Sequence, residues 1–254
     1  LYGQEPLDAQ AIVDEYLGYA ERLSPHVADT GHEMTAALRS RKRILAEGAQ
    51  GTLLDLGFGT YPFVTSSHPT IGGVMLGLGV GPQHVERVVG VVKAYQTRVG
   101  AGPMPTELTG PLGDRLRGTG AQPWDEFGTT TGRPRRCGWL DGVTLRHAVQ
   151  VNGLTEFGLT KLDVLSGFDT LQVCVAYELD GERIEQMPAD LAVLARCRAI
   201  YQELPGWSGD ISAAREFDDL PEQARAYVAF VEDLMGISAS CISVGPGREE
   251  TIRR

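Results

Sequence analysis

The chain has 254 residues, enough for one α/β domain with a full hydrophobic core. Hydrophobic residues make up 42% and charged residues 22% of it, a balance that predicts a folded protein. The formal net charge of −10 argues against a nucleic-acid binder, because affinity for nucleic acid comes mostly from a basic surface. With no membrane-length apolar stretch and no signal peptide, we expect a cytoplasmic protein without a membrane partner. The widely spaced cysteines suit buried thiols in a reducing compartment: Cys137, Cys174, Cys197 and Cys241.

The first part of the chain predicts two helices, a short strand and a long loop. Apolar residues recur at helical spacing over 7–23, where Asp8 can cap the first turn, and a second helix is expected over 33–39. A strand over 43–47 leads into a glycine-bearing turn. The stretch 57–73 is dense in Gly, Thr, Ser and Pro, which predicts a loop.

The middle of the chain predicts a helix over 81–89 and a β-branched strand over 91–99. Residues 110–124 are poor in apolar side chains, so we expect an exposed, mobile loop there. A helix over 141–152 and a buried strand in the apolar run 157–165 follow.

The last part of the chain predicts a hairpin, two helices and a final strand. The hairpin joins strands 170–178 and 182–185 through a turn at Asp180 and Gly181. The remaining expected elements are helices over 191–204 and 221–235, the second with Pro221 at its first position, and a strand over 238–244. Because strands alternate with helices, we predict a single α/β domain over residues 1–254, with a largely parallel central sheet flanked by helices.

A lysine and an aspartate, Lys161 and Asp163, stand two residues apart at the end of the run 157–165. Guanine presents two adjacent donors, N1–H and the 2-amino group, and a carboxylate can accept from both. The alkyl stem of Lys161 can cover the face of a base. This pattern indicates a guanine site, although a strand end with two solvated charges would give the same short motif.

Three arginines, Arg133, Arg135 and Arg136, follow a run of threonines and a glycine. Guanidinium groups bind carboxylates and phosphates through two parallel hydrogen bonds, and threonine hydroxyls add neutral donors. Such a segment could bind a dicarboxylate, a phosphate or both, and a solvated basic loop is the alternative.

Weaker signals come from single polar residues. Gln50 offers a donor and an acceptor to a base edge or a ribose, and Thr65 could bind a phosphate oxygen, but ordinary loop hydrogen bonding explains each residue alone more simply. The glycines at 77, 79 and 81 are not followed by Lys-Ser/Thr and do not form a phosphate loop. His68 and His84 lack partners at metal-ligand spacing, so no metal site is expected within the chain.

Several of these strings, taken in order, resemble the adenylosuccinate synthetase family. The resemblance covers the chain from about Arg43 to its end. The matching strings are EGAQGTLLD (47–55), GTYPFVTSS (59–67), KAY (93–95), TRVGAGP (97–103), PTEL (105–108), TTGRPRRCGWLD (130–141), LTKLDVL (159–165), PGW (205–207) and SVGP (243–246).

The resemblance implies a ligase of purine biosynthesis that joins L-aspartate to inosine monophosphate (IMP) and makes adenylosuccinate. The γ-phosphoryl group of GTP would move to O6 of the inosine base, and the aspartate amine would then displace it. The resemblance also implies Mg²⁺, a homodimer and a sheet similar to that of P-loop NTPases.

The resemblance further assigns site residues to three substrates. It implies IMP contacts by Gln50, Thr65, Val99 and Arg133. It implies aspartate contacts by Thr129, Thr130, Thr131, Gly132, Arg133 and Arg135. It implies GTP contacts by Arg135, Lys161, Leu162, Asp163, Ser243, Val244 and Gly245.

The family's glycine-rich phosphate loop, with its catalytic aspartate and Mg²⁺ contact, and the catalytic histidine have no counterpart here, since no Gly-Asp-Glu-Gly-Lys string occurs. We therefore expect the chain to match the carboxy-terminal three-fifths or so of the enzyme, with the catalytic residues and metal ligands upstream of Leu1. The fold would be incomplete on its amino-terminal side, and the 254 residues alone would be inactive. The alternative is a non-catalytic module that binds guanine nucleotides.

Overall fold

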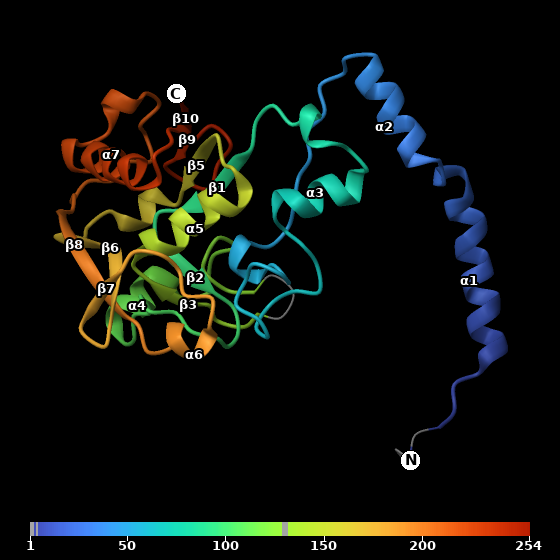
Figure 1. Cartoon of the computed structure of the whole chain (residues 1–254), viewed down its shortest axis with the longest axis horizontal. Coiled ribbons are helices and arrows are strands. Elements are labelled where there is room, and N and C mark those ends of the chain that lie inside the picture. Colours follow the sequence, from blue (N-terminus) through green and yellow to red (C-terminus); the bar gives the residue numbers. More distant parts are fainter. Residues whose placement is uncertain (1–2, 4, 129–131) are drawn as a thin grey trace.

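The computed structural model describes residue 3 and residues 5–128 and 132–254. Two helices, α1 (Ala9–Leu23) and α2 (Thr30–Arg39), form an arm that reaches away from the rest of the chain (Figure 1). Asp8 caps α1 as predicted. Asp29 caps α2, which begins at Thr30, three residues before the predicted start of that helix. Every residue of α1 is exposed, so its apolar side chains pack into no core among the described residues.

A four-stranded sheet forms the centre of the structure, in the order β1-β5-β9-β10. Its strands are β1 (Val89–Lys93), β5 (Glu156–Thr160), β9 (Ala239–Ser243) and β10 (Thr251–Arg253). The first three strands run parallel, and β10 is antiparallel to β9. Lys93 pairs with Thr160, and Leu159 pairs with Ile242, so the carboxyl ends of the parallel strands lie at one edge.

A second sheet is built around the long strand β6 (Thr170–Leu179). It pairs in parallel with β4 (Leu140–Asp141) and antiparallel with β7 (Glu182–Ile184) and β8 (Arg198–Pro205). The predicted hairpin between β6 and β7 is confirmed, since Asp180 and Gly181 have φ angles of 54° and 86°. A mixed α/β fold rich in parallel strands is therefore confirmed.

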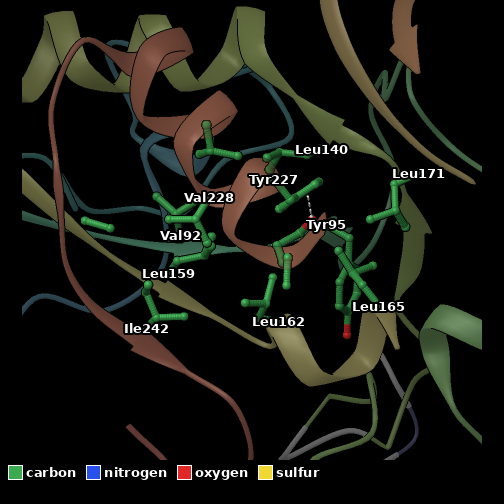
Figure 2. Close-up of a cluster of buried hydrophobic side chains, with 14 of the residues drawn as sticks. Val92, Tyr95, Leu140, Leu159, Leu162, Leu165, Leu171, Tyr227, Val228 and Ile242 are labelled. Carbon is green, nitrogen blue, oxygen red and sulfur yellow. Dashed lines mark hydrogen bonds between the residues drawn. The ribbon is translucent and has the colours of Figure 1, made fainter. Parts of the chain in front are cut away.

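Helix α7 (Glu222–Met235) packs its apolar stripe into the core beside the central sheet. Figure 2 shows Tyr227 and Val228 of this helix among Leu159, Leu162 and Ile242. The residues that α7 buries recur at helical spacing: Ala224, Tyr227, Val228, Val231 and Met235. The Tyr227 hydroxyl donates to the Ala94 carbonyl oxygen at 2.5 Å, which ties α7 to the chain after β1.

Helix α5 (Gly142–Asn152) matches its prediction and is capped by Asp141, whose carboxylate accepts from the Val143 and Thr144 N–H groups. Pro221 is the N-cap of α7 and not its first helical residue. The smaller elements are α3 (Ile71–Leu78), α4 (Pro111–Arg117), α6 (Leu191–Leu194) and the antiparallel pair β2 (Gln96–Arg98) and β3 (Arg136–Gly138).

Several predicted elements are wrong. Residues 43–47 form no strand, and Leu45 in that segment is 92% exposed, so neither burial nor a partner strand stabilises one. The predicted helix 81–89 is a short 3₁₀ turn, Pro82–His84, followed by β1. The predicted strand 91–99 divides into β1 and β2. The predicted helix 191–204 is helical only in its first turn, Leu191–Leu194. Its second half belongs to β8, because pairing with β6 outweighs the local helical pattern.

The exposed loop predicted over 110–124 contains α4, whose Leu116 is buried in the core. The predicted loop over 57–73 ends at Thr70, the N-cap of α3. Among the helices of the described residues, none is long and apolar enough to cross a bilayer.

The buried hydrogen bond from Tyr227 gives a stability prediction. We expect Tyr227→Phe to lower the free energy of unfolding by about 1–3 kcal/mol, because the buried Ala94 carbonyl loses its side-chain donor. Equilibrium urea denaturation followed by circular dichroism measures this. Tyr16→Phe, on the exposed helix α1, is the matched control and should leave the urea midpoint unchanged. An equal midpoint for both variants would contradict the assignment.

Candidate functional site

Polar groups gather where the parallel strands of the central sheet end. Lys93 is the last residue of β1, Lys161 follows β5, and Ser243 is the last residue of β9. Since these strands are adjacent and parallel, the three residues lie at the same edge. Ligands of open α/β sheets bind at this kind of edge.

The chain turns sharply after β5. Lys161 has a left-handed φ of 65°, which ends the strand and starts the 3₁₀ turn Leu162–Leu165. Leu162 thereby turns into the core and is fully buried, while Lys161 and Asp163 stay half-buried at the edge. The predicted guanine-site side chains are thus those of Lys161 and Asp163, and the side chain of Leu162 belongs to the core.

Asp163 lies in an environment that disfavours its charge. Burial raises the pKa of its carboxyl group, its own backbone N–H and Lys161 partly offset this, and the charges of Glu250 and Asp210 raise the pKa further. A pair of donors brought by a ligand would replace the hydrogen bonds to water that this carboxylate has lost. The carboxylate is therefore suited to accept a purine edge with two N–H groups.

The turn after β9 is fixed by hydrogen bonds. The Ser243 hydroxyl donates to the Gly245 carbonyl at 2.7 Å, and the Val244 N–H donates to the Glu250 carbonyl at 2.8 Å. A Cβ atom on Gly245 would lie 2.5 Å from the Glu250 carboxylate, so the Glu250 side chain would have to move to admit a larger residue. The predicted residues Ser243, Val244 and Gly245 therefore form one hydrogen-bonded turn beside the end of β5.

A buried carboxylate, that of Glu126, joins the strand edge to residues 133–136, which we call the arginine segment. Its side chain is 1% exposed and accepts from Lys93 Nζ at 2.7 and 2.8 Å, from Arg135 Nη1 at 2.5 Å and from the Tyr95 hydroxyl at 3.0 Å. Lys161 Nζ lies 3.3 Å from the same carboxylate. Burial would raise the pKa of Glu126, but Lys93, Lys161 and Arg135 outweigh it and lower the pKa to about 2.

The arginine segment itself is closed by backbone hydrogen bonds. The Arg135 N–H donates to the Glu126 carbonyl at 2.9 Å, and the Gly128 N–H donates to the Arg133 carbonyl at 2.8 Å. Gly132 has a φ of 63°, and its N–H donates to the Gly128 carbonyl at 2.7 Å. The predicted aspartate-binding residues Thr129, Thr130 and Thr131 lie outside the described residues.

The three arginines of the predicted cluster have different surroundings. Arg135 contacts Glu126, whereas Arg136 forms a two-pronged ion pair with Glu107 and donates to the Gly102 carbonyl at 2.7 Å. Arg133 is exposed. Arg136 therefore holds the loop around Gly102, and Arg133 and Arg135 remain the candidate ligand-binding arginines.

The predicted IMP residues Thr65 and Val99 lie on two loops joined by Arg98. This buried guanidinium donates to the Thr60 hydroxyl at 2.8 Å, to the Phe63 carbonyl at 3.0 Å and to the Ala101 carbonyl at 2.9 Å. Val99 is 46% exposed beside this contact. Gln50, which is also among the four predicted IMP residues, is exposed and has a left-handed φ of 64°.

A second buried carboxylate, that of Asp55, organises the loop that carries Thr65. It accepts from the Gly57 N–H at 2.8 Å, the Phe58 N–H at 3.0 Å, the Thr70 hydroxyl at 2.9 Å and His68 Nδ1 at 3.1 Å. Burial would raise the pKa of Asp55, but these donors lower it to about 2. His68 is thus a polar partner of Asp55.

Sequence reasoning missed both Glu126 and Asp55. The available signal for Asp55 was the Asp-x-Gly sequence, which is typical of a side chain that binds the backbone two residues ahead. Glu126 could have been found only by expecting a carboxylate between Lys93, Arg135 and Lys161. These three residues are far apart in the sequence, so the sequence does not show that they meet.

The strand edge does not fit a magnesium ion. In the described part of the chain, no three His, Cys, Asp or Glu side chains come close enough to hold a metal. Glu126 is already occupied by Lys93, Arg135 and Lys161, and Mg²⁺ requires oxygen ligands. The donors at this edge suit phosphate or carboxylate groups of a ligand instead.

Comparison with known proteins supports the resemblance. The family model of adenylosuccinate synthetase matches residues 1–252. The adenylosuccinate synthetase of Moorella thermoacetica is 56% identical over 252 residues, which are 99% of this chain and 58% of that enzyme. That of Parasynechococcus marenigrum is also 56% identical, over 57% of its length. The chain thus spans less than three-fifths of these relatives.

Solved structures give the same result. A structure of fully ligated adenylosuccinate synthetase from Plasmodium falciparum superimposes with a TM-score of 0.93 at 40% identity, covering 98% of this chain and 59% of that one. A cyanophage S-2L succinoaminodeoxyadenylate synthetase bound to dGMP and dATP aligns at 20% identity with a TM-score of 0.53, over 89% of this chain and 50% of that one. The second likeness supports the fold alone.

The two buried carboxylates predict how stability depends on pH. The pKa values of Asp55 and Glu126 in the folded protein are both about 2, below their ordinary values. Above pH 5, each carboxylate therefore contributes about 2–3 kcal/mol to the free energy of unfolding. This contribution is lost as the pH falls towards 2. Urea denaturation between pH 5 and pH 2 measures the loss. Glu126→Gln should show a shallower pH dependence than the wild type, and an identical slope would contradict the role of Glu126.

Proposed function

The chain belongs to the adenylosuccinate synthetase family, and from this we propose that the intact protein is a GTP-dependent ligase of purine biosynthesis. It joins L-aspartate to IMP and forms adenylosuccinate, GDP and phosphate. The observation that carries the proposal is the meeting of Asp163, Lys161 and the turn after β9 at one edge of the central sheet, beside the arginine segment.

We assign the guanine base of GTP to this edge. Asp163 accepts the N1–H and 2-amino donors of the base, and the stem of Lys161 covers its face. The backbone of Leu162 shapes the turn. Ser243, Val244 and Gly245 close over the base from the neighbouring strand. Support for this assignment comes from the half-buried state of Asp163 and from the hydrogen bonds that shape the turn after β9.

We assign L-aspartate to the segment 129–135 and IMP to the loops on either side of Arg98. Gly132, Arg133 and Arg135, with the threonines at 129–131, receive the two carboxylates of aspartate, and Arg135 also reaches GTP. Gln50, Thr65, Val99 and Arg133 contact IMP. The contact of Arg98 with the Thr60 hydroxyl, which holds these loops together, supports the placement of Thr65 and Val99.

The proposed reaction has two steps. The γ-phosphoryl group passes from GTP to O6 of the inosine base, with GDP as the leaving group. The aspartate amine then attacks C6, and phosphate leaves with the O6 oxygen. Phosphoryl transfer depends mainly on positioning and on neutralising charge, which Arg135 can supply on this side of the site.

The remaining parts of the enzyme are assigned outside these 254 residues. They are the catalytic aspartate, the catalytic histidine and the Mg²⁺ ligands. When bound, Mg²⁺ would supply further positive charge to the phosphates. A homodimer in the cytoplasm and a sheet similar to that of P-loop NTPases complete the proposal.

Replacement of the base-reading carboxylate tests the guanine assignment. We expect Asp163→Asn in the intact protein to lower kcat/KM for GTP by an amount that corresponds to about 2–4 kcal/mol. The reason is that the amide N–H₂ group would face an N–H donor of guanine. Xanthosine triphosphate, which carries an oxygen in place of the 2-amino group, should be tolerated better by the variant than by the wild type. Unchanged kinetics with GTP would remove Asp163 from the site.

A second test separates the ligase from a non-catalytic module that only binds guanine nucleotides. We expect the 254 residues alone to form no adenylosuccinate from IMP, GTP and aspartate, and the intact protein to form it. Adenylosuccinate is measured by its absorbance, with heat-inactivated protein as the control. Turnover by the 254 residues would refute our assignment of the catalytic groups. Guanine-nucleotide binding without turnover by the intact protein would favour the binding module.

A further inference from the structure

We propose that Glu126 is a positioning residue that couples the aspartate site to the guanine site. The inference rests on the proposed function, because it takes the roles of Arg135 and Lys161 from there. Glu126 itself contacts neither substrate. It acts through the two cations that it holds.

The geometry of the Glu126 carboxylate suits this role. Its Oε2 atom accepts from Arg135 Nη1 at 2.5 Å, and its Oε1 atom lies 3.3 Å from Lys161 Nζ. One carboxyl group thus binds a cation from the arginine segment and a cation from the end of β5. Arg135 contacts it through Nη1, and among the described residues the Nε and Nη2 atoms of the guanidinium make no further hydrogen bond, so they can meet a ligand.

The backbone and the side chain of Glu126 are also fixed by hydrogen bonds to other residues. Its N–H donates to the Arg117 carbonyl at 2.8 Å, and its carbonyl accepts from the Arg135 N–H at 2.9 Å. The Tyr95 hydroxyl and Lys93 Nζ bind its carboxylate from the core side. With so many fixed contacts and 1% exposure, the carboxylate can move little, so Arg135 and Lys161 share one fixed anion.

The charges around Glu126 make this group of side chains sensitive to an anionic ligand. Three positive side chains, Lys93, Arg135 and Lys161, share a single buried carboxylate. The excess positive charge favours an anionic ligand, and like charges in a half-buried site repel one another. A carboxylate of aspartate on Arg135 would neutralise part of this excess and fix the guanidinium. Once aspartate binds Arg135, more of the Glu126 charge acts on Lys161, which is then held in place before GTP arrives. The two ligands should therefore bind with positive coupling.

Steady-state kinetics of the intact protein test the inference. We expect Glu126→Gln to raise the KM for both GTP and aspartate about tenfold, while the KM for IMP changes less than about twofold. The matched control is Glu107→Gln, which removes the carboxylate paired with Arg136 and has no contact with Lys161. Its KM for GTP should stay within about twofold of the wild type.

Glu126→Asp covers the case in which the neutral variant fails to fold. It keeps the charge but is one methylene shorter, so it cannot reach all its cations at once. We expect it to raise both KM values severalfold. Unchanged KM values for GTP and aspartate in a folded variant, or a rise for one substrate only, would overturn the inference.

A measurement on the wild type needs no variant. With IMP omitted so that no ligation occurs, the Kd for GTP is measured by calorimetry with and without saturating aspartate. We expect aspartate to tighten GTP binding at least threefold, and equal Kd values would overturn the inference. A wild-type protein that makes no adenylosuccinate would instead reject the proposed function, so the two failures are distinguishable.

Discussion

The candidate site depends on a buried carboxylate that balances several cations. Lys93, Arg135 and Lys161 come from β1, the arginine segment and the end of β5, and mutual repulsion would separate them without Glu126. Desolvation of a lone carboxylate is costly, so Glu126 is itself stable only because those cations surround it. The pKa of Glu126 is lowered because these cations stabilise the charged form of its carboxylate. Neither the carboxylate nor the cations can be understood separately.

The parallel register of the central sheet makes this balance possible. Lys93 pairs with Thr160, one residue before Lys161, so the two lysines reach the same edge. β9 runs parallel to β5 on its other side, which brings the turn at Ser243 to that edge as well. Antiparallel strands would have sent alternate ends to opposite sides of the sheet. The site therefore depends on the order of the strands as much as on the identity of the residues.

The sequence predicted the elements that are stabilised by their own periodicity and caps. Helix α1 with its Asp8 cap, helix α5 and the hairpin between β6 and β7 are examples. It failed for β8, because the pairing with β6 that makes this segment a strand comes from residues distant in the chain. It also failed for 43–47, whose apolar centre has no partner strand.

At the site, the motifs indicated which residues matter, but only the structure separates neighbouring residues. Arg135 and Arg136 look equivalent in the sequence, yet side chains of adjacent residues in an extended segment point to opposite sides. One therefore contacts Glu126 at the strand edge, and the other contacts Glu107. The same reasoning applies to Lys161 and Leu162, where the left-handed turn exposes the polar residue and buries the apolar one. The direction of each side chain, set by the backbone, decides which of two adjacent residues can meet a ligand.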